Sequence, residues 1–115
     1  MAERGIRIAA ALSAALAITA GAFGAHGAAN AEAADWLRTG GSYQLLHAVA
    51  AMAIAHSFPR TAWALLAGAG WFALTLYLMA IGGPRWLGAL TPIGGVVMIG
   101  GWLAVAWSAW RTEQD

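Results

Sequence analysis

The chain has 115 residues, of which 61% are hydrophobic and 10% charged, with six arginines, five carboxylates and a formal net charge of +1. A soluble domain usually has about a quarter of its residues charged, so this composition excludes a small water-soluble protein and favours a lipid environment. The balanced charge provides no basic patch for nucleic acid. The chain has no cysteine, which excludes disulfides and cysteine-ligated metal sites.

Four long stretches without a charged residue indicate four transmembrane helices within a single transmembrane domain over residues 1–115. A hydrocarbon core of about 30 Å is crossed by about 20 residues of helix, and each stretch supplies one crossing. We place the four spans at 6–25, 43–58, 61–81 and 92–110.

The end of the first span has the sequence GAFGAHG over 21–27, for which three interpretations compete. A nucleotide-binding glycine loop requires GxGxxG after a strand, and the spacing here is GxxGxxG. Arg4 and Arg7 before an apolar run, with ANA before Glu32, also resemble a secretory signal peptide. Because the apolar run is long enough to cross a bilayer, we expect a retained membrane helix.

The connection between the first two spans has the features of a short helix. Asn30 is a preferred N-cap residue and Gly40 a preferred residue after a helix end. Carboxylates stand early in this segment and Arg38 late, as the helix dipole favours. Trp36 suits the depth of lipid headgroups. We therefore predict a short interfacial helix between Asn30 and Gly40.

The later spans are delimited by glycine and proline. Gly82, Gly83 and Pro84 end the third span, and Pro92 suits the first turn of the fourth. Small residues recur on every span and let helix backbones approach closely in lipid. The sequence thus predicts an all-α membrane protein that folds as a tight four-helix bundle. The expected helix-packing positions are Gly21, Gly24, Gly94, Gly95, Gly100 and Ala104.

The arginines predict the orientation of the chain. Four spans place both termini on one side, which receives Arg4, Arg7, Arg60 and Arg111, whereas the other side receives Arg38 and Arg85. Positively charged residues favour the cytoplasmic side. We expect a multi-pass protein of the inner membrane with both termini in the cytoplasm.

A few polar residues lie at membrane depth, toward the predicted outer face. Polar groups at this depth are costly and often functional. Three alternatives stay open: a hydrogen-bonded clasp between helices, a haem or metal site using His26 and His47, and a small pocket for a lipid or solute. We favour the clasp and expect no cofactor and no metal ion. The residues of this cluster are His26, Tyr43, Gln44, His47 and Thr91.

The spans contain no carboxylate, which argues against proton-coupled export, and no serine with a nearby histidine and carboxylate, which argues against proteolysis. We therefore expect a protein that is not an enzyme. The predicted role is an accessory or scaffold subunit in the lipid bilayer, packing against other membrane subunits or its own copies. The alternative is a small transporter, or a protein that binds a lipid or cofactor at the outer His26–Tyr43–His47 cluster.

Three motifs together resemble a known family. They are GAFGAHG at 21–27, YQLLHA at 43–48, and LGALTPIGG at 87–95 followed by Gly101 and Trp102. The combination looks like the YgdD family of small membrane proteins, which includes transmembrane protein 256 and is classed as a domain of unknown function. The resemblance implies a multi-span inner-membrane protein and brings no established activity.

Overall fold

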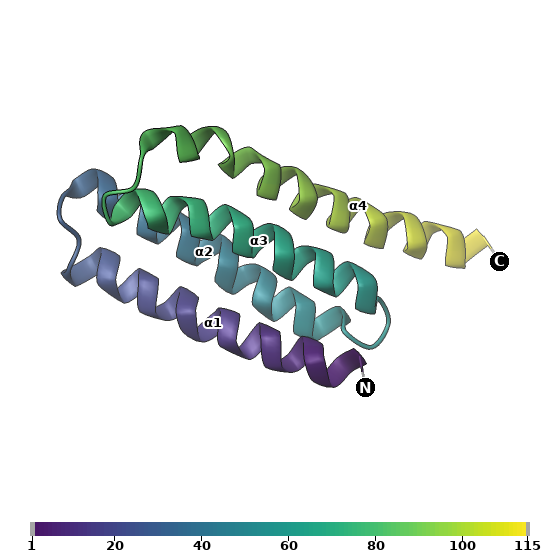
Figure 1. The fold of residues 1–115 in the computed structure, drawn as a ribbon. Helices are drawn as coiled ribbons and strands as arrows, with labels where there is room; N and C mark the ends of the chain where they lie inside the picture. Colours follow the sequence, from purple (N-terminus) through teal and green to yellow (C-terminus); the bar gives the residue numbers. More distant parts are fainter. Residues whose placement is uncertain (1, 115) are drawn as a thin grey trace.

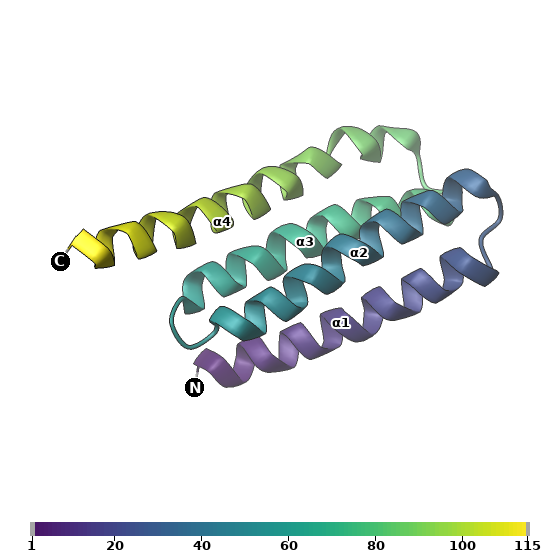
Figure 2. The ribbon, with the colours of Figure 1, turned by 180° about the vertical axis from the view of Figure 1, so that it is seen from behind.

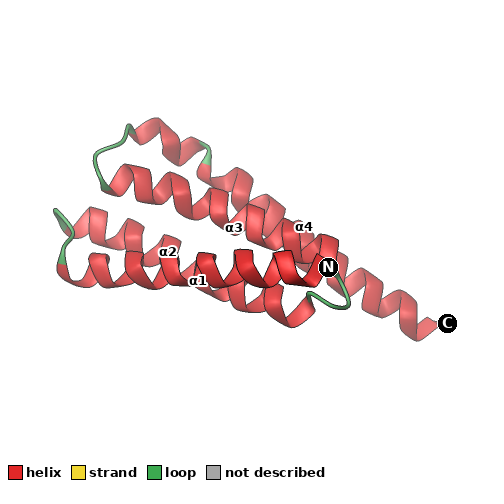
Figure 3. Cartoon of the chain, turned by 60° about the horizontal axis from the view of Figure 1, so that its bottom comes forward, coloured by secondary structure: helices red, strands yellow, loops and turns green. Residues whose placement is uncertain are grey.

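The computed structural model describes residues 2–114, which form helices joined by short turns. The elements are α1 (Ala2–His26), α2 (Ala31–Ile54), α3 (Pro59–Ala80), the 3-10 helix η1 (Arg85–Ala89) and α4 (Thr91–Gln114). Successive long helices run in opposite directions (Figures 1 and 2), and Figure 3 shows the short connections between them. The predicted all-α class is confirmed.

The molecule has two distinct ends. Both chain termini and the α2–α3 turn lie at one, which we call the terminal end (Figure 1). The α1–α2 turn (residues 27–30) and the α3–α4 connection (residues 81–90) lie at the other, which we call the distal end. This arrangement gathers all the charged residues of the described chain at the two ends.

Within residues 2–114, three segments are long and apolar enough to cross a membrane: Glu3–His26, Pro59–Ala80 and Arg85–Thr112. The helix α2 is not one of them, because it carries charged residues in its first turns and Gln44 and His47 farther along. It lies between α1 and α3 and packs extensively against both. Two of its polar side chains, Gln44 and His47, are buried.

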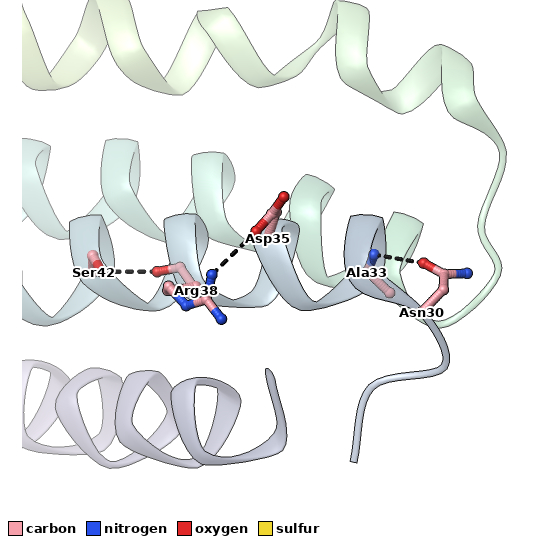
Figure 4. Close-up of polar contacts among 5 residues, drawn as sticks. All are labelled: Asn30, Ala33, Asp35, Arg38 and Ser42. Carbon is pink, nitrogen blue, oxygen red and sulfur yellow. Dashed lines mark hydrogen bonds and ion pairs between the residues drawn. The ribbon is translucent and has the colours of Figure 1, made fainter. Parts of the chain in front are cut away.

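The start of α2 follows the predicted capping. Asn30 has an extended backbone, and its side-chain oxygen accepts a 2.8 Å hydrogen bond from the backbone N–H of Ala33 (Figure 4). Nearby, Arg38 pairs with Asp35, and the Ser42 hydroxyl donates to the Arg38 carbonyl. The prediction of Asn30 as a helix N-cap is confirmed.

The predicted separate interfacial helix is wrong, because α2 continues through Gly40 and Gly41 to Ile54. Both glycines are packing positions inside the helix. A Cβ atom at Gly40 would lie 2.8 Å from a ring carbon of Tyr77, and one at Gly41 would lie 2.9 Å from the Ala17 carbonyl oxygen. The glycines therefore let α1 and α3 approach α2 closely.

The four predicted spans fall within α1 to α4, except that the third extends one residue beyond Ala80 and the second extends beyond Ile54. There α2 ends at Ile54, and residues 55–58 form the turn that leads to Pro59 at the start of α3. Proline is tolerated at this position because its missing N–H has no partner within the helix. At the other end of α3, Gly82 adopts a φ of +103°, which glycine accommodates without strain.

A closed four-helix bundle is not confirmed. Within residues 2–114, the backbone of α4 approaches those of α3 and η1 but not those of α1 and α2. The helices α1, α2 and α3 pack together, and α4 packs alongside α3 and extends past the other helices at its C-terminal end (Figure 1). One face of α4 is therefore covered by the protein, and its other faces are open.

The core of the three packed helices consists mainly of alanine. Large apolar side chains instead cover the outer faces of the helices, above all those of α1 and α4, where lipid accommodates them. Small core residues bring the helix axes close together, and dispersion contacts then hold them. The buried cluster comprises Ile6, Ala10, Ala48, Ala51, Ala55, Ala62 and Leu66.

Candidate functional site in the helix interior

Gln44 is the central polar residue of the interior, and it joins three helices. Its side chain is 4% exposed. The amide nitrogen donates a 3.0 Å hydrogen bond to the hydroxyl oxygen of Ser13 on α1. The amide oxygen accepts a 2.6 Å hydrogen bond from the hydroxyl of Tyr77 on α3. Both ends of the buried amide are thus bonded, and α1, α2 and α3 are held together at one level.

His47 lies one turn farther along α2 and connects it to α4. Its Nε2 accepts a 3.0 Å hydrogen bond from the indole N–H of Trp102, and its Nδ1 lies 2.7 Å from the Tyr43 carbonyl oxygen. Because an indole N–H can only donate, Nε2 must be the acceptor and Nδ1 must carry the proton. The two contacts therefore define a neutral histidine with both nitrogens occupied.

A third set of contacts attaches the start of α4 to α3. The hydroxyls of Thr75 and Thr91 lie 2.7 Å apart, and the indole N–H of Trp71 donates a 2.8 Å hydrogen bond to the Leu90 carbonyl. The Thr91 hydroxyl also lies 3.2 Å from the Leu87 carbonyl oxygen one turn earlier. These bonds hold the α3–α4 connection against the side of α3.

The predicted polar cluster is only partly assembled. Tyr43, Gln44 and His47 lie on adjacent turns of α2, but they do not share one set of partners: Gln44 bonds α1 and α3, whereas His47 bonds α4. The Tyr43 ring is 47% exposed and packs against Phe72, with ring centroids 4.8 Å apart. Thr91 pairs with Thr75 and is not bonded to either histidine.

His26 does not join this cluster. Ser13 marks the level of Gln44 on α1, and His26 follows it by thirteen residues, which corresponds to roughly 20 Å along the helix. His26 lies at the distal end of α1, exposed beside Phe23. His26 and His47 are therefore too far apart to ligate one haem or metal ion, and His47 has no free nitrogen to offer.

Several partners in this network do not belong to the predicted cluster: Ser13, Thr75, Tyr77 and Trp102. Each carries an uncharged hydrogen-bonding group within an otherwise apolar helix, and that contrast is the signal that could have found them. Their pairing depends on how each helix is rotated about its axis, which the sequence of one span does not reveal.

The predicted packing positions divide between covered and open faces. Gly24 packs against Leu37 and Ala34 of α2, and Gly94 packs against Gly68 of α3. Gly21 lies beside Gly41, although its own Cβ position is open. Gly95 and Gly100 likewise have open Cβ positions, and Ala104 is exposed. These three residues lie on α4 faces turned away from α3.

The covered face of α4 is marked by a different pair of glycines. A Cβ atom at Gly94 would lie 2.5 Å from the Gly68 carbonyl oxygen, and one at Gly101 would lie 2.6 Å from a methyl carbon of Leu65. The seven-residue spacing places Gly94 and Gly101 on one helix face. This spacing determines which glycines of α4 meet α3.

Charged groups occupy the two ends of the molecule. At the distal end, Arg85 donates hydrogen bonds from both terminal nitrogens to the carboxylate of Glu32, and its guanidinium lies 5.5 Å from the ring centroid of Trp36. At the terminal end, His56 pairs with Glu3. An uncharged middle region with polar groups bonded to one another separates these ends.

Helices of membrane-spanning length, apolar outer faces, a hydrogen-bonded interior and charges confined to the ends define a small α-helical integral membrane protein. The chain belongs to the family described as Protein of unknown function (DUF423), whose model matches residues 20–95. The resemblance to the YgdD family is thereby confirmed.

Relatives across most of the chain are also membrane proteins. This chain is 39% identical to the UPF0382 membrane protein SSP2132 of Staphylococcus saprophyticus, over 81% of this chain and 86% of that protein. It is 33% identical to a UPF0382 membrane protein of Haemophilus influenzae, over 90% and 91%. It is 31% identical to the UPF0382 inner membrane protein YgdD of Escherichia coli, over 99% and 95%. No solved structure matches the chain.

Proposed function

We propose that this protein is a non-catalytic accessory subunit of the inner membrane that packs against a transmembrane helix of another polypeptide. The observation that carries the proposal is the position of α4, whose backbone packs against α3 and η1 but approaches neither α1 nor α2. Its outward face presents Gly100 and Ala104 at four-residue spacing, and both are exposed. This small-xxx-small pattern lets two helix backbones approach closely in lipid.

The interior polar groups support a structural role. Gln44 is bonded at both ends of its amide, and His47 at both ring nitrogens. Each polar atom of these two buried side chains is already engaged within the protein, which supports a structural role over solute binding or proton transfer. The alternative, a transporter or binding protein using His26, Tyr43 and His47, lacks the convergence of these three residues that it requires.

We further propose that all four long helices cross the bilayer, with both termini in the cytoplasm. The terminal end carries Arg4, Arg7, Arg60 and Arg111, whereas Arg38 and Arg85 lie at the distal end. The arginine excess at the terminal end supports a cytoplasmic location of that end. The shielding of α2 by α1 and α3 supports its crossing despite its polar residues.

Cysteine cross-linking tests the packing face directly, because the chain contains no cysteine. Ala104→Cys carries a short thiol-directed photo-cross-linker on the proposed face, and Ala106→Cys is the matched control on another exposed face of α4. In native membranes, the Ala104 variant should form an adduct with a different polypeptide, and the control should not. Equal labelling of both variants, or an adduct with a second copy of this chain alone, would contradict the accessory role.

The orientation is tested by a membrane-impermeant maleimide on intact cells. Ala29→Cys lies in the distal turn and should react from outside. Thr112→Cys lies at the terminal end and should react only after the membrane is opened. Reaction of both residues from the same side would show that the chain does not cross the membrane as proposed.

A further inference from the structure

The distal end contains a cavity of about 490 Å³ between the end of α1, the start of α2 and the end of α3. Its volume falls within the range of about 300–1,000 Å³ typical of small-molecule sites. Phe23, Leu37 and Met79 supply apolar lining, whereas Asn30, Glu32 and Arg85 supply polar lining. The cavity is therefore amphipathic, with separate groups for an apolar and a polar part of a ligand.

The polar lining contains both signs of charge. Arg85 uses two N–H groups to bond the Glu32 carboxylate, and a guanidinium has five donors, so donors remain for an anionic group. Glu32 likewise retains lone pairs on its oxygens for a cation. The pair as a whole is neutral, so a ligand with one positive and one negative charge matches it better than an ion of either sign.

The first turn of α2 adds backbone donors to the same lining. The N–H groups of Ala33 and Ala34 donate to Asn30. Within the described residues, those of Ala31 and Glu32 have no protein acceptor, as is usual at a helix start. Glu32 and Asn30 line the cavity, so this helix start, with its partial positive charge, adjoins the free donors of Arg85.

In the topology proposed above, the cavity also lies at the depth of lipid headgroups. It is formed where segments of membrane-spanning length end, beside the charged residues of the distal end. Trp36 is part of its lining, and tryptophan is enriched at the boundary between hydrocarbon and water. A ligand at this position can extend a hydrocarbon chain into the bilayer and keep a charged group at the surface.

We propose that this cavity binds a zwitterionic phospholipid with an amino headgroup. The phosphodiester accepts hydrogen bonds from Arg85 and the α2 start, the ammonium group contacts the Glu32 carboxylate, and the glycerol and first acyl carbons lie along Phe23 and Met79. The site is separate from the proposed packing face on α4. Lipid binding in this cavity does not require a partner helix on α4.

The test uses the full chain purified in mild detergent, with bound lipid counted by native mass spectrometry. Phosphatidylethanolamine is offered in competition with an equal amount of phosphatidylglycerol, which has no ammonium group. A separate arm adds inorganic phosphate, and another adds soluble glycerophosphoethanolamine. Phosphatidylethanolamine should be retained preferentially, and neither soluble compound should displace it at equal concentration.

Two variants with matched controls locate the binding. Arg85→Gln removes the anion-binding donors, and its control Arg38→Gln removes the exposed arginine paired with Asp35 outside the cavity. Ala29→Trp fills the cavity from an exposed turn and leaves every charge intact, and its control is the exposed Ala25→Trp. Each site variant should weaken binding by roughly tenfold, and the controls should bind like the unaltered chain.

Circular dichroism melting shows whether each variant is folded, and Ala29→Trp keeps the test decisive if Arg85→Gln is not. Equal lipid retention by Ala29→Trp and Ala25→Trp would overturn the proposal. Equal retention of the two lipids would also overturn it, since Glu32 would then have no role. Displacement by inorganic phosphate would show a site for free anions and no lipid site.

Discussion

The contact between α3 and α4 leads to a sharp prediction, because two adjacent glycines of α4 should respond to the same substitution with opposite signs. A Cβ atom at Gly94 would lie 2.5 Å from the Gly68 carbonyl oxygen and 2.7 Å from the Phe72 backbone nitrogen. Ordinary van der Waals contact begins at 3.4 Å, so Gly94→Ala is about 0.9 Å short of space against rigid backbone. Gly95 has nothing within 4 Å of its Cβ position.

The magnitudes follow from two opposing effects. Overpacking costs about 1–3 kcal/mol, whereas replacing glycine by alanine inside a helix gains up to about 1 kcal/mol. Gly94→Ala should therefore destabilise the fold, and Gly95→Ala should stabilise it slightly. The two variants should differ by roughly 2 kcal/mol.

The assay is unfolding by sodium dodecyl sulfate in mild-detergent micelles, followed by circular dichroism. Gly68→Ala on the facing helix should also destabilise, because its Cβ would lie 3.0 Å from the Gly94 carbonyl oxygen. The double variant Gly68→Ala, Gly94→Ala should lose less stability than the sum of the two single losses, since one outward shift of α4 relieves both clashes. Equal stability of Gly94→Ala and Gly95→Ala would refute the close α3–α4 contact.

The hydrogen bonds and glycines of α2 lead to three more predictions, each measured by the same unfolding titration. Gln44→Leu removes two interhelical hydrogen bonds. At the membrane average of about 0.6 kcal/mol for each bond, the free energy of unfolding should fall by about 1 kcal/mol. An unchanged stability would mean that other hydrogen bonds replace these two. Trp102→Phe removes the hydrogen-bond donor to His47 and should lower the free energy of unfolding by about 0.6 kcal/mol. In a chain that already carries His47→Ala, the same substitution should cause no such loss. Gly41→Ala should cost about 1–3 kcal/mol because its Cβ would lie 2.9 Å from backbone, whereas Gly21→Ala on the facing helix, with an open Cβ position, should not destabilise.

The boundaries of the helices were predictable where a local rule decides them. Asn30 caps α2 as its residue type indicates, and Pro59 begins α3. Gly40 shows the limit of such rules, because glycine serves both to end helices and to bring them together. Its role depends on the ring of Tyr77, a residue of another helix. Nothing in the local sequence of α2 records that contact.

The polar residues that lie at membrane depth were predictable from the sequence, but the residues to which they are hydrogen-bonded were not. Gln44 and His47 stand out because they interrupt apolar sequence, and both are buried and bonded. Their partners depend on which face of each neighbouring helix turns inward. Trp102, for example, reaches His47 from α4, although the backbones of α2 and α4 do not approach each other. A long side chain bridges that gap, and backbone packing rules do not predict such a bridge.

The distribution of polarity among the helices has a consequence for how the fold is assembled. The helices α1, α3 and α4 are each long and apolar enough to cross a membrane by composition, whereas α2 is not. Gln44 and His47 have side-chain partners on α1, α3 and α4, and an unbonded polar group in hydrocarbon costs several kcal/mol. In the four-span topology that we propose, α2 is therefore stable in the membrane only when it is packed against its neighbours. The apolar helices α1 and α3, which flank α2 in the chain, are those neighbours, and the hydrogen bond from Trp102 joins α4 to the same network.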